Sequence, residues 1–286
     1  MKKIFTLLCA GVSLAVQAQT KQVSQAVITT KTVITAPEDD ENQSGTSTSA
    51  GPNGEEIRVV RFGGEGETKS TTTIKNDLVK TFSESEMGRT TVIRDNNKKI
   101  TTTIMEIMGR KMGSYATDED QALINKRIDS MMRSRRNDGS LVEATSAAPP
   151  KIDFVYQEET RKIAGYECKK ALMISTRAEQ KKSDTTVVWY LPDTRFQGVT
   201  TTGGPAGPFG GMRMQGTDAW EKLNGFPMQY ERNLNRGRKM SVQVTKLVIG
   251  KEIDDKEFEI PKDVELKSAK DMQNGNGPGI QLRFGN

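Results

Sequence analysis

Residues 90–105 read Thr-Thr-Val-Ile-Arg-Asp-Asn-Asn-Lys-Lys-Ile-Thr-Thr-Thr-Ile-Met. β-Branched residues dominate both halves of this stretch, and they favour strands because their side chains pack well on a pleated surface. Between the halves, Asp95-Asn96-Asn97 supplies residue types that tolerate the left-handed backbone of a hairpin turn. The stretch therefore predicts two antiparallel strands, Thr90–Arg94 and Lys99–Met105.

Further segments rich in Thr, Val and Ile flank this hairpin at intervals typical of an antiparallel meander. Before position 117 they are Val27–Thr35, Ile57–Phe62, Thr68–Lys75, Leu78–Phe82 and Lys111–Ala116. After position 150 they are Ile152–Gln157, Glu167–Ile174, Thr185–Leu191, Met228–Arg232, Met240–Val248 and Phe258–Ile260. We therefore expect a mainly β protein of the α+β class.

One segment has helical rather than strand periodicity, and it predicts a helix over Asp118–Arg136. Thr117 is placed as its N-cap, with acidic residues in the first turn and arginines at the far end, which matches the helix dipole. Its apolar residues share one face: Ile124, Ile128, Met131 and Met132. We expect this face to pack on the sheet; alternatively, its flexible methionines line an adaptable ligand cavity.

The first 18 residues have the layout of a cleavable signal peptide, with two lysines, an apolar run and small residues at Val16 and Ala18. The run is shorter than the roughly 20 residues that a membrane-spanning helix needs. Cys9 lies in the middle of the run, after Leu7-Leu8, which argues against lipidation. We expect an exported protein without a transmembrane segment, periplasmic or secreted, or associated with the outer membrane.

A single domain is expected over residues 19–266. Within it, the acidic and polar stretch 36–54 predicts a disordered loop, and the Gly-rich stretch 200–216 predicts a second loop. Residues 267–286, rich in Gly and Asn, are expected to form a flexible tail.

Catalytic and metal-binding patterns are scarce. The chain has no histidine, which excludes Ser-His-Asp catalysis and His-based metal sites. Cys168 is the one cysteine outside the signal segment, and it is either a buried small hydrophobe or a reactive thiol. Phosphate-loop, nucleophile-elbow and dinucleotide patterns are absent. We therefore expect no enzyme activity, no cofactor and no metal; a hydrolase using two carboxylates is the remaining catalytic alternative.

The charge pattern speaks against a nucleic-acid partner. Lys and Arg number 42 and Asp and Glu number 37, so the net charge is +5, and both signs are interspersed along the chain. A protein that binds nucleic acid usually masses its basic residues on one face or stretch.

The stretch 162–171, Lys-Ile-Ala-Gly-Tyr-Glu-Cys-Lys-Lys-Ala, resembles a K-I-x-G-Y-x-C-K-K block of a group of bacterial envelope proteins of unknown function. That group is related to the GLPGLI family and, with it, is similar to the LolA-like superfamily. Thr186–Tyr190 resembles the Trp-Tyr strand that follows in the family. Gly225–Glu231 stands in the place of the GLPGLI motif but departs from it, which favours the sister group.

This resemblance implies a curved antiparallel half-barrel with a helix against its concave face, a face that holds acyl chains in LolA-like proteins. The residues of the block also have a physical interpretation of their own. Gly165 permits a hairpin turn, after which Tyr166 and Cys168 share one face of a strand. We interpret these three residues as a structural motif.

Three functions remain open at this point. The first is a non-enzymatic envelope protein that binds or carries a lipid, a lipoprotein acyl chain or another hydrophobic ligand. Its candidate ligand-binding residues are Ile124, Ile128, Met131, Met132, Trp189 and Tyr230. The second is a structural or interaction protein that engages an envelope protein through sheet edges and loops, and the third is the carboxylate hydrolase.

Overall fold

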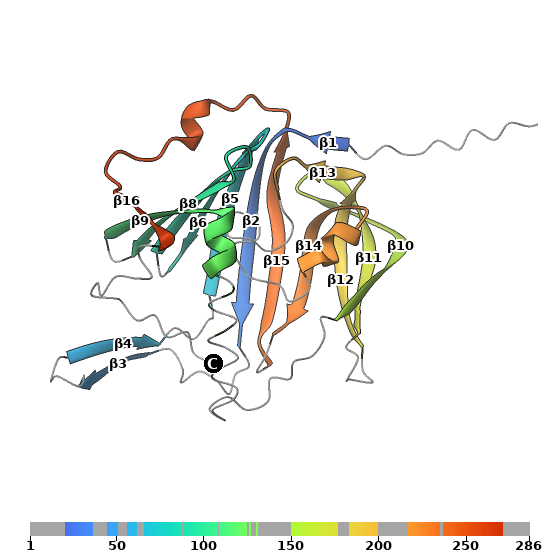
Figure 1. Cartoon of the computed structure of the whole chain (residues 1–286). Helices are drawn as coiled ribbons and strands as arrows, with labels where there is room; N and C mark the ends of the chain where they lie inside the picture. The colour runs from blue at the N-terminus through green and yellow to red at the C-terminus, as the bar shows by residue number, and fades with distance from the viewer. Residues whose placement is uncertain are drawn as a thin grey trace, which may run out of the picture.

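The computed structural model of the chain describes residues 21–36, 45–50, 56–61, 66–86, 88–107, 109–124, 126, 130, 150–176, 183–199, 217–234 and 237–270. Twelve strands form one curved sheet (Figure 1). In spatial order they are β10 (Lys151–Ile163), β11 (Tyr166–Thr176), β12 (Asp184–Pro192), β14 (Gly225–Asn233), β15 (Lys239–Ile249), β2 (Gln25–Thr35), β5 (Gly66–Lys75), β6 (Leu78–Ser85), β7 (Gly88–Asp95), β8 (Ile100–Ile107), β9 (Arg110–Thr117) and β16 (Leu266–Ser268). Only β9 and β16 pair in parallel in this sheet. The predicted mainly β, antiparallel architecture is confirmed.

Smaller elements lie outside this sheet. Among the described residues they are the parallel pair β1 (Lys21–Val23) and β13 (Thr194–Phe196), the antiparallel pair β3 (Gly45–Ala50) and β4 (Glu56–Arg61), and the short 3-10 helices η2 (Thr217–Lys222) and η4 (Asp255–Phe258). An α-helix begins after β9 and covers residues 118–124. In the described part of the chain no helix has the length and apolarity needed to cross a membrane.

The N-terminal strand β2 lies in the middle of the sheet, between β15 and β5. Its sequence alternates so that Ala26, Ile28 and Thr30 are buried on one face, as period-2 patterning requires. Ile28 lies opposite Leu247 of β15 and Thr72 of β5, so one strand joins segments that are far apart in the chain.

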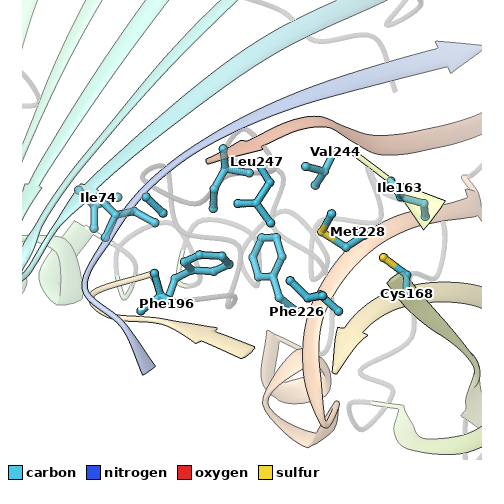
Figure 2. Close-up of a cluster of buried hydrophobic side chains, with 13 residues drawn as sticks. Ile74, Ile163, Cys168, Phe196, Phe226, Met228, Val244 and Leu247 are labelled. Atoms are coloured by element: carbon cyan, nitrogen blue, oxygen red, sulfur yellow. The ribbon is translucent and has the colours of Figure 1, made fainter. Parts of the chain in front are cut away.

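The largest group of buried side chains, here the large cluster, collects residues from both halves of the sheet (Figure 2). Phe196 and Phe226 meet edge to face in it, with ring centroids 4.7 Å apart and an interplanar angle of 83°. Ile74 approaches them from β5 and Leu247 from β15. The parallel pair β1–β13 therefore packs its apolar residues onto the main sheet.

Another part of the sheet buries hydroxyl groups instead of apolar side chains. Thr30, Ser70, Thr72 and Thr81 are all nearly inaccessible to solvent. Cross-strand hydrogen bonds join Ser70 to Ser83 at 2.9 Å and Thr72 to Thr81 at 3.0 Å. These pairs satisfy the hydroxyls of Ser70, Thr72 and Thr81, which would otherwise be costly to bury, whereas the buried Thr30 hydroxyl has no hydrogen-bond partner among the described residues.

The chain after β15 crosses the sheet as an extended segment, residues 250–268, which we call the C-terminal strap. Lys75 pairs with Asp255 at 2.5 Å, the Lys80 ammonium donates to the Glu257 carbonyl at 2.6 Å, and Lys111 pairs with Asp263 at 2.6 Å. A small apolar cluster also holds the strap: Ile93, Ile253 and Phe258, with Val27 and Leu78 packed against them. The strap ends as β16 on the outer edge of β9.

Two local expectations differ from the structure. Phe258–Ile260 is not a strand: Phe258 ends η4, whose first turn is capped by the Asp254 side chain accepting from the Lys256 N–H at 2.9 Å. This turn directs Phe258 into the small apolar cluster. Residues 45–50, inside the stretch expected to be a disordered loop, form β3 and pair with β4.

Gly225 and Gly250 provide a test of backbone packing. Gly225 has φ +154°, and a Cβ built on it would lie 2.1 Å from the Leu191 carbonyl oxygen. Gly250 has φ +75° but open space around it. Gly225→Ala should lower the free energy of unfolding by roughly 3 kcal/mol, whereas Gly250→Ala should lower it by about 1 kcal/mol. Urea denaturation measures both, and equal losses would contradict the packing described at Gly225.

Candidate functional site

Five aromatic side chains gather near the β10 edge of the sheet and form what we call the aromatic cluster: Phe154, Tyr156, Tyr190, Trp220 and Tyr230. Trp220 lies against Tyr230 with ring centroids 4.9 Å apart, and Tyr156 meets Tyr190 edge to face at 5.6 Å. Aliphatic side chains complete the packing: Ile152, Ala171, Met173, Val188, Leu223, Met240 and Val242.

The short helix η2 inserts Trp220 into this cluster. Trp220 is 1% exposed, although it belongs to a six-residue 3-10 segment rather than to a strand. Hydrogen bonds to backbone groups hold the segment in place. The Tyr156 hydroxyl donates to the Lys222 carbonyl at 3.2 Å and accepts from the Asn224 N–H at 3.0 Å. The Arg195 guanidinium donates to the carbonyls of Glu221 and Leu223 at 3.0 and 3.2 Å.

Exposure changes across the aromatic cluster. Tyr230 is 3% exposed at its base, whereas Tyr156 on the edge strand is 40% exposed. Burial raises the pKa of the Tyr230 and Tyr190 phenols. Both phenols therefore stay neutral at physiological pH. Tyr156, 40% exposed, is the most exposed ring of the cluster.

Trp189 and Tyr230, both proposed as ligand-binding residues, are not brought together. Val188 is the residue opposite Tyr230, and Trp189 is opposite Gln229, so the Trp189 and Tyr230 side chains leave opposite faces of the sheet at this point. Trp189 packs against the large cluster, and the Arg161 guanidinium lies 5.7 Å from its ring centroid. Only Tyr230 belongs to the aromatic cluster.

The helix proposed to cover the ligand begins where the sequence predicts. The Thr117 hydroxyl accepts from the Asp120 N–H at 3.1 Å, and the Asp120 carboxylate accepts from the Thr117 N–H at 3.2 Å. This reciprocal arrangement caps the first turn. Ile124 is half-buried. Three of the proposed ligand-binding residues lie outside the described residues: Ile128, Met131 and Met132.

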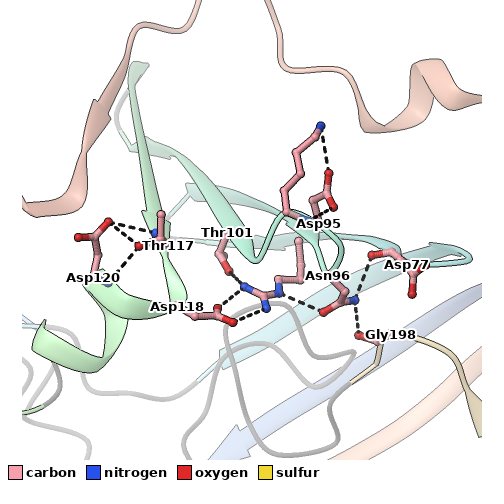
Figure 3. Close-up of polar contacts among 10 residues, drawn as sticks. Asp77, Asp95, Asn96, Thr101, Thr117, Asp118, Asp120 and Gly198 are labelled. Atoms are coloured by element: carbon pink, nitrogen blue, oxygen red, sulfur yellow. Dashed lines mark hydrogen bonds and ion pairs between the residues drawn. The ribbon is translucent and has the colours of Figure 1, made fainter.

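A polar network fixes the start of this helix to the sheet (Figure 3). The Arg94 guanidinium donates two hydrogen bonds to the Asp118 carboxylate, at 2.6 and 3.0 Å, and a third to the Asn96 side-chain oxygen at 3.1 Å. The Asn96 amide in turn donates to the carbonyls of Asp77 and Gly198, at 3.0 and 3.2 Å. Three separate loops and the helix are thereby joined.

The face below this helix start carries polar as well as apolar side chains. Register places Arg94 opposite Val79 and Val92 opposite Thr81, so Arg94 shares a face with the buried hydroxyls of β5 and β6. A bidentate guanidinium–carboxylate pair and hydroxyl ladders are poor surroundings for an acyl chain. The aromatic cluster under η2, whose packed side chains are all apolar or aromatic, lies several strands away from the helix and is the better candidate site.

The residues proposed as a structural motif lie in a turn and in the strand that follows it. Ala164 and Gly165 have φ values of 52° and 88°, which form the hairpin turn between β10 and β11. Cys168 is fully buried in the large cluster, and Tyr166 packs against the same cluster. Burial raises the pKa of the Cys168 thiol to about 11, which keeps it protonated and unreactive.

The sequence analysis missed Trp220 and its surroundings. Residues 217–224 carry neither strand alternation nor a helical repeat, so nothing local indicates that this tryptophan is buried. Phe154 and Tyr156 did carry a signal, since their i, i+2 spacing on a predicted strand puts both rings on one face. In the described part of the chain, no group of three or more acidic or cysteine side chains is arranged to hold a metal ion.

Comparisons with known proteins give no family. No protein-family model matches the chain, and no curated protein matches it significantly. Two solved structures, of PNGF-II in the P21 and C2 space groups, align with 88% and 87% of this chain at 15% and 16% identity. The TM-scores are 0.35 and 0.34, and the chain spans about a third of the length of those proteins. Similarity this low supports no assignment of fold or function.

The burial of Cys168 predicts its reactivity. In the folded protein at about pH 8, the thiol should resist Ellman's reagent for hours, because both its exposure and its thiolate fraction are very low. After unfolding in guanidinium chloride it should react within minutes. Rapid labelling of the folded protein would contradict the burial of this side chain.

The Arg94–Asp118 pair predicts a pH dependence. Hydrogen bonds from Arg94 hold the pKa of Asp118 below its ordinary value of 3.8. Because the pKa is lowered in the folded state, the stabilisation is present above about pH 4 and is lost as the pH falls through the folded-state pKa. Arg94→Met should return the pKa of Asp118 toward 3.8 in an NMR titration. Asp95, whose pKa is lowered by Lys98 instead, is the internal control and should not change.

Proposed function

We propose that this chain is a non-enzymatic, exported envelope protein that binds a hydrophobic ligand, such as a lipid or a lipoprotein acyl chain, at the aromatic cluster. The observation that carries the proposal is Trp220, a large side chain that fills the cluster from a short 3-10 segment. In this proposal η2 is the cover, and the ligand takes the place of the Trp220 indole.

The contacts of η2 support a cover that can move. The segment has six residues, too few for a self-stabilising helix, and it follows the Gly-rich stretch 200–216 in the sequence. The Tyr156 hydroxyl and the Arg195 guanidinium donate to backbone carbonyls in and next to this segment, and these carbonyls remain available to water when the segment lifts. The exposed ring of Tyr156 at the sheet edge is the point of entry.

The family resemblance in residues 162–171 supports the same class of function, because LolA-like proteins hold acyl chains on the concave side of a curved sheet. The helix after β9 was the expected cover. Since the described face near its start carries Arg94 and buried hydroxyls, the proposal places the ligand under η2 instead.

Trp220→Ala tests this proposal with dansyl-labelled lauric acid as the probe. Removing the indole should cost roughly 3–5 kcal/mol of stability, because it leaves a cavity. If the indole occupies the ligand's place, the variant should also bind the probe at least fivefold more tightly than the unmodified protein. Fluorescence titration at a temperature where both proteins are folded measures the ratio.

Phe226→Ala is the matched control, because it deletes another fully buried ring, 2% exposed, from the large cluster. It should lower stability without increasing probe affinity. Equal gains in both variants would indicate nonspecific cavity binding. No binding by either protein, together with lipid-free organic extracts of the natively purified protein by mass spectrometry, would refute the hydrophobic-ligand proposal.

A further inference from the structure

The strand β10 forms one border of the twelve-stranded sheet. It pairs with β11, and among the described residues no strand lies on its other side. At the opposite border the strap covers β9 with β16. An uncovered edge leaves every second residue with backbone N–H and C=O groups that have no ladder partner, and these groups are a template for another strand.

The two halves of β10 differ in the charge of their exposed side chains. From Glu158 to Lys162 every residue is exposed and four of the five are charged, the usual means of blunting an edge strand. From Lys151 to Gln157 the sequence is Lys-Ile-Asp-Phe-Val-Tyr-Gln, with Val155 and Tyr156 47% and 40% exposed. The first half is therefore less charged than the second and exposes two apolar side chains, although its Ile152 carbonyl accepts from the Lys222 ammonium at 3.3 Å.

This less charged segment, residues 151–157, has defined ends. Pro150, which has no N–H to donate, immediately precedes it. At its other end the pairing register of β10 shifts between Gln157 and Thr160, a bulge that interrupts regular pairing. The regular run is therefore residues 151–157, and its central residue is Phe154.

From this geometry we infer that the β10 edge pairs with a second copy of the same chain, as antiparallel strands related by a two-fold axis at Phe154. Two residues that lie opposite each other in an antiparallel pair have their side chains on the same face of the sheet. A two-fold axis perpendicular to the sheet keeps this rule only if some residue lies opposite its own copy, with the axis midway between the two. With Phe154 opposite its own copy, all seven residues from 151 to 157 are paired.

In this register, each pair of residues that lie opposite each other in the dimer is physically compatible. Phe154 meets its own copy and Ile152 meets Tyr156 on the face of the aromatic cluster, which are favourable apolar and aromatic cross-strand pairs. On the other face Asp153 meets Val155, and Lys151 meets Gln157. Since Lys151 and Asp153 already form an ion pair at 3.0 Å within each strand, no like charges oppose each other across the axis.

An exposed apolar row lies beside this edge and adds to the same surface. Val155 is opposite Leu172, and Leu172 is opposite Val187, so the row crosses three neighbouring strands. Val187 is 42% exposed. Pairing of two copies brings the rows together on one face of a continuous sheet. The inference stands if no lipid binds. Because the dimer covers Tyr156, the point of entry of the proposed ligand, the ligand would enter the monomer.

Analytical ultracentrifugation of the full chain over about 1–200 µM tests the dimer. A single seven-residue strand pair buries less than the roughly 1,200 Å² of stable complexes, so we expect a dissociation constant in the micromolar range. Val155→Asp places a carboxylate opposite Asp153 of the other copy, twice in each dimer, and should weaken association at least tenfold. The added change Asp153→Lys turns both contacts into attractive pairs and should restore the dimer.

Ile260→Asp is the matched control, because it places the same carboxylate on an apolar side chain of similar exposure, 40%, on the strap and outside the row beside β10, and it should leave the dissociation constant unchanged. Hydrogen exchange on the unmodified protein should show slower exchange of amides in residues 152–156 at high concentration. A monomer at every concentration would overturn the inference. So would a dimer that Val155→Asp leaves intact, a double variant that fails to re-associate, or equal losses in the Ile260→Asp control.

Discussion

The pairing of β2 with β15 is the constraint on which the rest of the molecule depends. β5 to β9 follow one another along the chain and can pair as local hairpins, and so can β10, β11 and β12. In the sheet, β14, β15 and β2 lie between these two groups, and β15 pairs with β2 from Thr35 opposite Lys239 to Ala26 opposite Ile249. The large cluster exists because this pairing brings Ile28 and Ile74 next to Leu247 and Met228. Without it, each group would expose the apolar face that the other covers.

Local patterns were sufficient to predict most strands and their turns. β-Branched runs marked the strands, and Gly165 marked a hairpin turn that the φ values of Ala164 and Gly165 confirm. The Asp95 turn is also present, although the residue with positive φ is Lys99 rather than an asparagine. Local patterns failed where distant contacts decide the conformation. Phe258–Ile260 has strand-like composition, yet Phe258 ends a 3-10 turn because its ring packs with Ile93 and Ile253. The three-residue strands β1, β13 and β16 are too short to have a pattern, and the parallel partner of each fixes it.

The candidate site was harder to predict than the fold, because a site depends on which face each residue takes. Tyr230 and Trp189 occur on neighbouring strands, and a difference of one residue in register sends their side chains to opposite faces. Trp220 comes from a segment with no periodicity, and it reaches the aromatic cluster only because Tyr156 and Arg195 hold the backbone around it. Phe154 and Tyr156 could have been found from their spacing on one predicted strand. The choice of η2 over the α-helix as the cover depends on which residues share each face of the sheet. That can be known only when the pairing of all the strands is known.

The C-terminal strap also determines how the molecule responds to mechanical force. Tension on the chain beyond residue 268 would act first on β16, which has three residues paired to β9, and then on the Lys111–Asp263 ion pair. Each contact breaks singly, so little force is needed for this step. Peeling then reaches Phe258 and Ile253, whose buried side chains must leave the small cluster together with the Lys80 and Lys75 contacts. Up to that point β15 carries no load, so the β2–β15 pairing stays closed while the strap extends. Under tension, the strap therefore extends at low force while the sheet stays folded.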